Sequence, residues 1–201
     1  MDGNHITYSL GDDGRRYFTN ADLADMVEQG LIDPDDRWEL IRGEWFDMPS
    51  ESFEHMDVRT VLHMIFSAAL KWPTEYRVSS EGSFFLSHDT ELRPDLAIYR
   101  ADVGTNEMSG TDLFLVAEVM KTSQRRDKTL KAPIYAEVNV PELWLIDLDA
   151  NTITVMRDPS NGKYRSETTV NSDHLLSALN FPEISISLDM LRGQSDGAPT
   201  R

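Results

Sequence analysis

Asp112-Leu113-Phe114-Leu115-Val116-Ala117-Glu118-Val119-Met120-Lys121 is an apolar run with one carboxylate inside it. The part from Leu113 to Met120 is too short for a typical helix and long enough for a strand that is covered on both faces. We therefore predict a central strand of a sheet. A carboxylate in such a strand is costly to desolvate unless a positive group pairs with it, so Glu118 should have a cationic partner.

A second acid stands in Arg93-Pro94-Asp95-Leu96-Ala97-Ile98-Tyr99. Because Pro94 cannot donate a hydrogen bond to a sheet, Asp95 should lie at the start of a strand or on a sheet edge, where its side chain can face a cleft. Taken alone, Asp95 could be a turn acid, and Glu118 could be a buried acid paired with an arginine for structure. Together with a nearby lysine, the two acids would make a magnesium site.

The composition of the 201 residues is that of one domain, with 40% hydrophobic residues and no cysteine. No apolar run reaches the roughly 18 residues that a membrane helix requires, and the N-terminus has no secretory signal. Disulfides and thiolate metal sites are excluded, and we expect a cytoplasmic protein. We divide the chain into an N-terminal extension (1–16), one domain (17–192) and a flexible tail (193–201).

The formal charge of −16 argues against general affinity for nucleic acids, because phosphate binding depends mainly on Lys and Arg. The basic residues are, however, unevenly spread. Five of them fall within eleven positions soon after Glu118, with Asp127 as the only acid among them: Lys121, Arg125, Arg126, Lys128 and Lys131. This cluster is either a solvated helix face or a phosphate-binding element, and the sequence leaves both open.

Apolar periodicity and turn residues predict the remaining elements. Three helices are expected, the first capped by Thr19 and the third by Ser123, over residues 20–29, about 51–72 and 124–138. The second helix has one apolar stripe, formed by Phe53, Met56, Val61, Leu62, Ile65, Phe66 and Ala69. A hairpin joins strands 38–41 and 44–48, and a second hairpin joins the stretch 76–86 to the strand of Asp95. Further strands are expected over 143–147, 152–156 and, as an edge strand, 164–170.

The ordered series of motifs resembles the Uma-two family, a branch of the PD-(D/E)XK restriction-endonuclease-like superfamily. The residues that carry the resemblance are Trp38-Glu39-Leu40-Ile41-Arg42-Gly43-Glu44, Met48-Pro49, His55, Arg93-Pro94-Asp95, Ala117-Glu118-Val119, Asp127, Lys131, Tyr135 and Val140-Pro141-Glu142-Leu143-Trp144-Leu145-Ile146-Asp147. The resemblance implies an α/β (α+β) fold in a single domain, with a mixed β-sheet flanked by helices. One departure is that family members usually have Ser-Pro-Ser-Thr where this chain has Lys121-Thr122-Ser123.

The resemblance also implies a metal centre. Asp95 and Glu118, on neighbouring strands, would bind one divalent ion together with the carbonyl oxygen of Val119, and hard oxygen ligands suit Mg²⁺ or Mn²⁺. Such an ion lowers the pKa of a bound water and neutralises charge on the scissile phosphate. The expected activity is endonucleolytic hydrolysis of nucleic acid, DNA by resemblance, by a homodimer.

The position of the catalytic lysine is ambiguous. The usual motif places it two residues beyond the glutamate, where this chain has Met120, and Lys121 points to the opposite face of the strand. Lys131 shares a helix face with Asp127 and Tyr135, and this face could point toward Glu118. We favour Lys131, oriented by Asp127, with Lys121 in reserve; the alternative is an ordinary ion pair between Lys131 and Asp127.

Two further residues belong to motifs of the resemblance. His55 is most simply a polar residue on the exposed side of its helix. The resemblance implies instead that it contacts phosphate or a metal-binding residue. Glu44 is either a surface acid or an additional ligand. Two other functions stay open for the whole chain: a catalytically silent nuclease-fold binding or regulatory module, and a dimerisation domain built on apolar strands such as Phe84-Phe85-Leu86.

Overall fold

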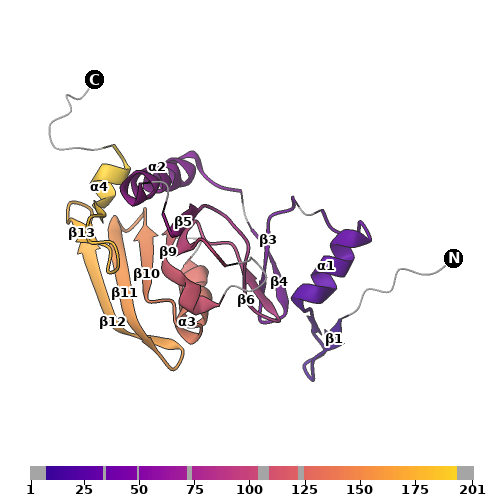
Figure 1. Cartoon of the computed structure of the whole chain (residues 1–201). Helices are drawn as coiled ribbons and strands as arrows, with labels where there is room; N and C mark the ends of the chain where they lie inside the picture. The colour runs from indigo at the N-terminus through magenta and orange to yellow at the C-terminus, as the bar shows by residue number, and fades with distance from the viewer. Residues whose placement is uncertain are drawn as a thin grey trace. The chain divides into compact units, whose positions relative to one another are not determined.

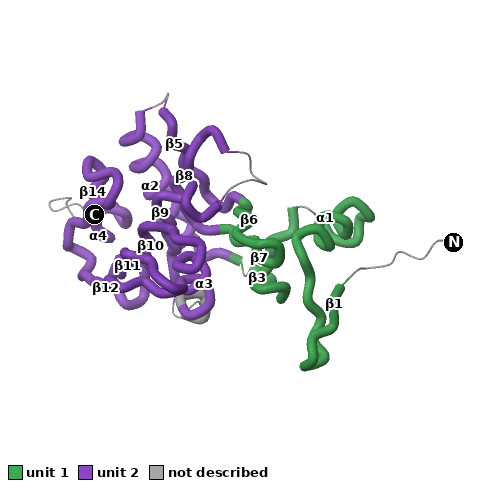
Figure 2. The backbone as a smooth tube through the Cα atoms, turned by 60° about the horizontal axis from the view of Figure 1, so that its bottom comes forward, with its two compact units in different colours: residues 1–50, 83–93 green, residues 51–82, 94–201 purple. Residues whose placement is uncertain are grey.

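Residues 8–33, 35–48, 50–71, 74–103, 109–121 and 125–193 are described by a computed structural model, without the side chains of 125–128. The backbone clusters into two compact units (Figure 2). Unit 1 comprises Met1–Ser50 and Ser83–Arg93, and unit 2 comprises Glu51–Gly82 and Pro94–Arg201. None of the described helices is long and apolar enough to cross a membrane.

Unit 1 contains a four-stranded sheet in the order β4-β3-β7-β6. Its strands are β3 (Trp38–Ile41), β4 (Glu44–Asp47), β6 (Phe84–Ser87) and β7 (Thr90–Leu92). Helix α1 (Asn20–Glu28) begins at Thr19, which forms a capping box with Asp22, and it contributes Leu23 to a small core with Trp38 and Leu40. A short pair of strands, β1 (Ser9–Leu10) and β2 (Arg16–Tyr17), precedes the helix.

Unit 2 is built on a six-stranded sheet in the order β12-β11-β10-β9-β8-β5 (Figure 1). The strands are β5 (Tyr76–Ser79), β8 (Leu96–Arg100), β9 (Leu113–Met120), β10 (Glu142–Asp147), β11 (Thr152–Ser160) and β12 (Lys163–Asn171). Only β9 and β10 pair in parallel, and the other neighbours are antiparallel. The remaining elements are α2 (Phe53–Leu70), η1 (Gly110–Asp112), α3 (Arg125–Glu137), β13 (Leu176–Ser177), β14 (Ser185–Ile186) and α4 (Leu188–Leu191).

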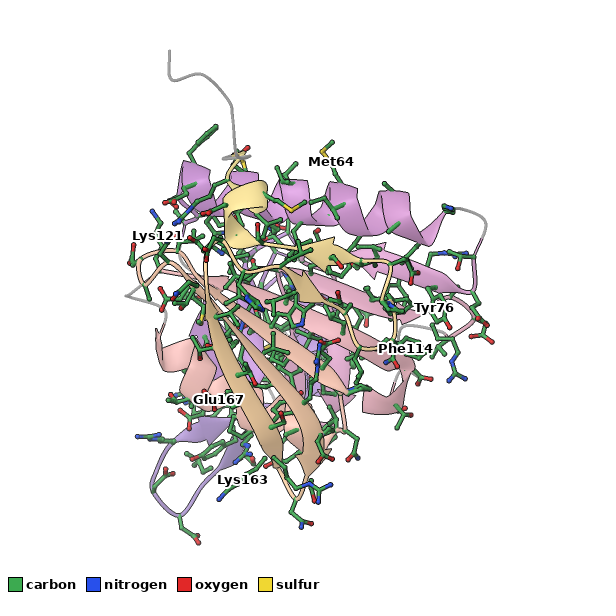
Figure 3. All side chains as sticks on the ribbon, turned by 90° about the vertical axis from the view of Figure 1, so that its left-hand side faces the viewer. Met64, Tyr76, Phe114, Lys121, Lys163 and Glu167 are labelled. Atoms are coloured by element: carbon green, nitrogen blue, oxygen red, sulfur yellow. The ribbon has the colours of Figure 1, made fainter. Side chains whose placement is uncertain are left out.

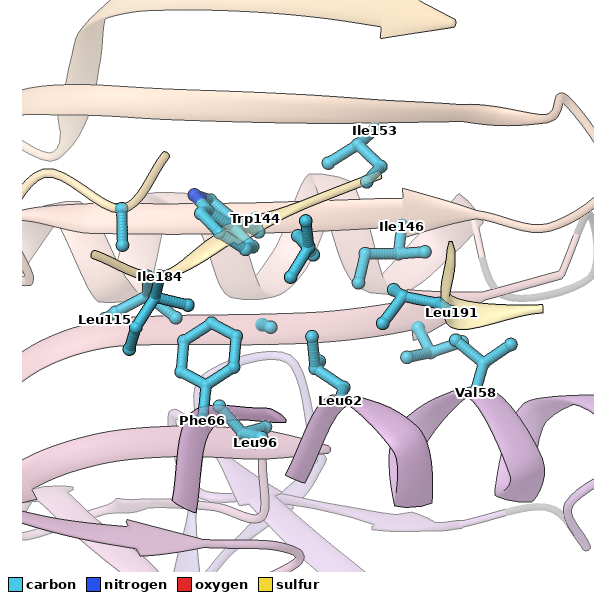
Figure 4. Close-up of a cluster of buried hydrophobic side chains, with 14 of the residues drawn as sticks. Val58, Leu62, Phe66, Leu96, Leu115, Trp144, Ile146, Ile153, Ile184 and Leu191 are labelled. Carbon is cyan, nitrogen blue, oxygen red and sulfur yellow. The ribbon is translucent and has the colours of Figure 1, made fainter. Parts of the chain in front are cut away.

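The core of unit 2 lies between α2 and the sheet (Figure 4). Val58, Leu62 and Phe66 of the helix pack in one cluster with Leu115, Ala117 and Val119 of β9. Because side chains alternate along a strand, Glu118 points to the opposite face, where it contacts α3. The two helices therefore cover opposite faces of the central strand.

The predicted fold class, a mixed sheet flanked by helices, is confirmed. The central strand is confirmed, since β9 lies between β8 and β10, and so are the first hairpin and the bodies of the three long helices. Asn139, with φ 63°, follows α3 as a left-handed residue. β12 is the edge strand that its polarity predicted, and Lys163 and Glu167 lie on it (Figure 3). Ser123 lies outside the described residues.

Two predictions about local structure are only partly right. Residues 76–79 (β5) pair antiparallel with the strand after Asp95, as the second hairpin requires, but β6 pairs instead with β7 in unit 1. The chain leaves one sheet and enters the other at Pro94, which cannot continue a ladder. The apolar stripe of α2 is confirmed from Val61 to Ala69 and wrong at the start of the helix, where Phe53 is 76% exposed and Met56 43%, while His55 is buried. The division into extension, domain and tail stays a prediction, and residues 1–7 and 194–201 lie outside the described residues.

Candidate metal centre

Two buried acids meet where β8 begins beside β9. The strands are antiparallel, with Leu96 opposite Ala117, so Asp95 and Glu118 lie next to this pair on the two chains. The Asp95 amide N is 3.5 Å from Glu118 Oε2, and the Val119 amide donates to Asp95 Oδ2 at 2.7 Å. Asp95 and Glu118 are each only 6% exposed. Asp95 therefore lies at the start of a strand, as the sequence predicted.

Helix α3 supplies the cationic partner that Glu118 was predicted to need. Lys131 Nζ is 3.4 Å from Glu118 Oε1, and the hydroxyl of Tyr135 donates to the same oxygen at 2.8 Å. Lys131 and Tyr135 are both buried. Their i,i+4 spacing places them on one face of the helix, as the sequence indicated. The lysine side chain is therefore available to the acid pair rather than to solvent.

His55 enters the site from α2, and its predicted exposed position is wrong. The residue is 4% exposed, with Nε2 2.8 Å from the carbonyl oxygen of Val119 and 3.2 Å from Asp95 Oδ2. Burial acts to lower the pKa of His55, but the Asp95 carboxylate, the charge of Glu51 and the Val119 carbonyl outweigh it, so the pKa is raised. His55 thus contacts Asp95, the residue that the resemblance implies to be a metal ligand.

Sequence reasoning missed three residues beside His55. Glu51 Oε2 is 3.7 Å from His55 Nδ1 and 3.0 Å from the Nη2 atom of Arg59, and Arg59 also pairs with Glu81. Part of the signal was present in the spacing, since His55 and Arg59 are four residues apart and share a face of α2, and Glu51 directly precedes the N-cap residue Ser52. The apolar residues around them drew the prediction to another face.

The other predicted residues are placed as follows. Lys121 Nζ is 2.9 Å from Glu54 Oε2 (Figure 3 labels Lys121). The hydrogen bond from Lys121 lowers the pKa of Glu54 most; burial opposes it, and Arg192 lowers the pKa further. Glu44 belongs to unit 1, where it pairs with Arg15 at 3.2 Å. The backbone of Asp127 lies in α3, but its side chain is outside the described part of the chain.

The donor set fits a divalent cation. Glu51, His55 and Asp95 each offer one ligand atom, and these atoms lie within 4.8 Å of one another. Nδ1 of His55 is buried and has no hydrogen-bond partner. Carboxylate oxygens and an imidazole nitrogen are ligands that divalent metals use in proteins. The side chains present can therefore hold such an ion.

A family model described as "Uma2: Putative restriction endonuclease" matches residues 23–190. The chain belongs to the Uma2 family. A solved structure described as "a putative nuclease belonging to DUF820", from Anabaena variabilis, is 17% identical, with a TM-score of 0.69, and the match covers 88% of this chain and 98% of that one. At this identity the match shows the fold. A search of curated proteins finds no match.

Membership in Uma2 confirms the resemblance drawn from the sequence. The family model begins inside α1 and ends inside α4, so it includes every residue of the acid pair and its neighbours. The family and the Glu51, His55 and Asp95 group both indicate a divalent metal. The family and the structural match together show a nuclease-like protein.

Proposed function

We propose that the protein is a metal-dependent endonuclease that hydrolyses phosphodiester bonds of DNA, with Mg²⁺ or Mn²⁺ bound by Asp95, Glu118 and the carbonyl oxygen of Val119. The observation that carries the proposal is the adjacency of two buried acids, with Lys131 Nζ 3.4 Å from Glu118 Oε1. Two acids beside a lysine, in a family described as restriction endonucleases, support hydrolysis at phosphorus better than any other reaction.

Each side chain has a distinct role in this proposal. The bound ion would lower the pKa of a coordinated water and offset charge on the phosphate. Lys131 would donate to the attacking water or to a phosphate oxygen, as a positioned cation does in phosphoryl transfer. Tyr135 holds Oε1 of Glu118, which leaves Oε2 directed toward Asp95. The Val119 amide fixes Oδ2 of Asp95.

A cleavage assay tests the proposal. The purified full chain is incubated with supercoiled plasmid in MgCl₂ or MnCl₂, and nicked and linear products are measured over time. We expect Glu118→Gln, Asp95→Asn and Lys131→Met to lose cleavage, and chelator to abolish it. Lys163→Met and Glu167→Gln, on the edge strand, are the matched controls and should cleave as the parent does. Cleavage that persists unchanged in the acid variants and with chelator would contradict the assignment.

The choice of lysine is tested in the same assay. If Lys121 acts instead of Lys131, then Lys121→Met loses activity and Lys131→Met keeps it. The pairing of Lys121 with Glu54 supports a structural role for Lys121. We therefore expect Lys131→Met to lose cleavage and Lys121→Met to keep it.

The second candidate function is a silent binding module with the nuclease fold. The formal charge of −16 favours it, because an acidic surface repels DNA. Calorimetry separates the two functions, since failure to bind Mg²⁺ or Mn²⁺ at millimolar concentration would favour the binding module. A homodimer in the cytoplasm is part of the proposal, and light scattering checks the dimer.

A further inference from the structure

His55 holds a buried nitrogen that the proposed hydrolysis does not use. Nε2 lies 2.8 Å from the Val119 carbonyl oxygen, which can only accept, so Nε2 carries the hydrogen. In a neutral imidazole, Nδ1 then carries a lone pair. Nδ1 has no hydrogen-bond partner and lies 3.7 Å from Glu51 Oε2. Two buried acceptors that face each other repel unless a proton or a metal cation lies between them.

The distance between these two acceptors suits a metal ion. Ligand atoms about 2.1 Å from one ion are separated by roughly 3.0 to 3.7 Å at ordinary coordination angles. A histidine that binds a metal also usually donates its other ring N–H to a carbonyl or a carboxylate. Nε2 of His55 does both, toward Val119 and Asp95. His55 is thus oriented as a metal ligand through Nδ1.

The charges around His55 also favour a divalent ion. Glu51 and Glu81 both pair with Arg59, and Asp95 lies on the other side of the ring. Three carboxylates against one guanidinium leave two negative charges in this group of described residues when His55 is neutral, as it is in a metal ligand. A divalent ion would neutralise them.

We propose that Glu51 and Nδ1 of His55 form a second cation position, with Asp95 orienting the imidazole from the Nε2 side, and that it takes Mn²⁺ or a related transition-metal ion in preference to Mg²⁺. An imidazole nitrogen among the ligands is the reason, because Mg²⁺ selects oxygen ligands and keeps its waters. The proposal rests on the proposed function only through Asp95, which is a ligand at the first position and orients His55 at the second. Metal binding at this position is therefore measured without reference to cleavage.

The experiment uses Mn²⁺ as the probe and electron spin-echo spectroscopy as the readout. In the parent protein we expect a nitrogen coupling on bound Mn²⁺, and we expect the same coupling in Glu118→Gln, which leaves the second position intact. His55→Gln keeps a donor near the Nε2 position and removes the Nδ1 lone pair. It should lose the coupling and weaken Mn²⁺ binding about 10-fold or more, as should Glu51→Gln.

The matched control is His63→Gln on the same helix. His63 Nδ1 lies 2.8 Å from the hydroxyl of Ser80, so its loss should leave the coupling unchanged. Absence of nitrogen coupling in the parent protein overturns the proposal even if the variants fail to fold. A coupling that survives in His55→Gln overturns it as well. Nitrogen-coupled Mn²⁺ without DNA cleavage would contradict the proposed function and leave this site standing.

Discussion

Glu118 and Glu142 are buried acids on neighbouring parallel strands, yet their surroundings differ. Glu142 Oε1 accepts from Arg157 Nε at 2.9 Å, Arg157 Nη2 at 2.6 Å and Trp144 Nε1 at 2.9 Å, and Oε2 accepts from the Leu179 amide at 2.7 Å. Both oxygens of Glu142 are thus held by permanent donors, and the residue is fully buried.

Glu118 has a lysine, a tyrosine and a second acidic residue as neighbours. A lysine is a flexible point charge, unlike the rigid fork of an arginine. The comparison teaches that burial alone does not identify a functional acid. Glu142 stabilises the junction of β10 and β11, whereas Glu118 is placed beside Asp95, where a cation can join the two acids.

The largest effect should come from Glu118→Gln on catalysis. We expect the cleavage rate to fall by about 1,000-fold or more, because one charged ligand is lost while the hydrogen bonds to Tyr135 can persist. The free energy of unfolding should change by less than about 1 kcal/mol, because losing the pairing with buried Lys131 is offset by relieving the repulsion between Glu118 and Asp95. Plasmid cleavage and urea unfolding of the same preparation check both numbers.

The next effect should come from Glu142→Gln on stability. Arg157 would lose its charged partner, and the amide cannot accept at both positions, so we expect a loss of about 2–3 kcal/mol in the free energy of unfolding. Arg157 is 34% exposed, which keeps the loss below that of a fully buried pair. The metal affinity should be unchanged. Equal stability losses in Glu118→Gln and Glu142→Gln would break the comparison.

A smaller effect is the stabilisation by metal. At a free Mn²⁺ concentration ten times the dissociation constant, the folded protein should gain about 1.4 kcal/mol. The gain should be present in Glu142→Gln and reduced in Asp95→Asn, which removes a proposed ligand of the first position. Thermal unfolding with and without MnCl₂ measures it, and a gain of equal size in Asp95→Asn would contradict the account.

The smallest effect concerns Glu54, a partly exposed acid paired with Lys121 and Arg192. Its pKa in the folded protein is lowered, so its contribution is present above the ordinary pKa of a glutamate and is lost as the pH falls through the folded value. Glu54→Gln should cost less than about 1 kcal/mol at pH 7. Unfolding curves from pH 7 down to pH 3 should show the difference between parent and variant disappear.

The sequence predicted the acid pair because its signals are local. A proline before Asp95 and an apolar run around Glu118 fix both residues on strands, and the family resemblance makes those strands neighbours. Lys131 and Tyr135 followed from helical spacing. These signals depend on one element each, which is why they are visible without a structure.

The histidine side of the site could not be predicted in the same way. The exposed Phe53 and Met56 suggested a buried stripe, whereas polar contacts with Asp95 and Val119 bury His55 instead. The role of Glu142 was equally hidden, because its partners Arg157 and Leu179 come from distant segments. The burial of His55 and the role of Glu142 both depend on polar contacts between segments that are far apart in the sequence.

The most direct test of the account is an anomalous difference map from crystals of the protein soaked in MnCl₂. The account predicts a peak about 2.0–2.6 Å from carboxylate oxygens of both Asp95 and Glu118. A map in which Mn²⁺ binds elsewhere, while these two carboxylates contact only protein, would contradict it.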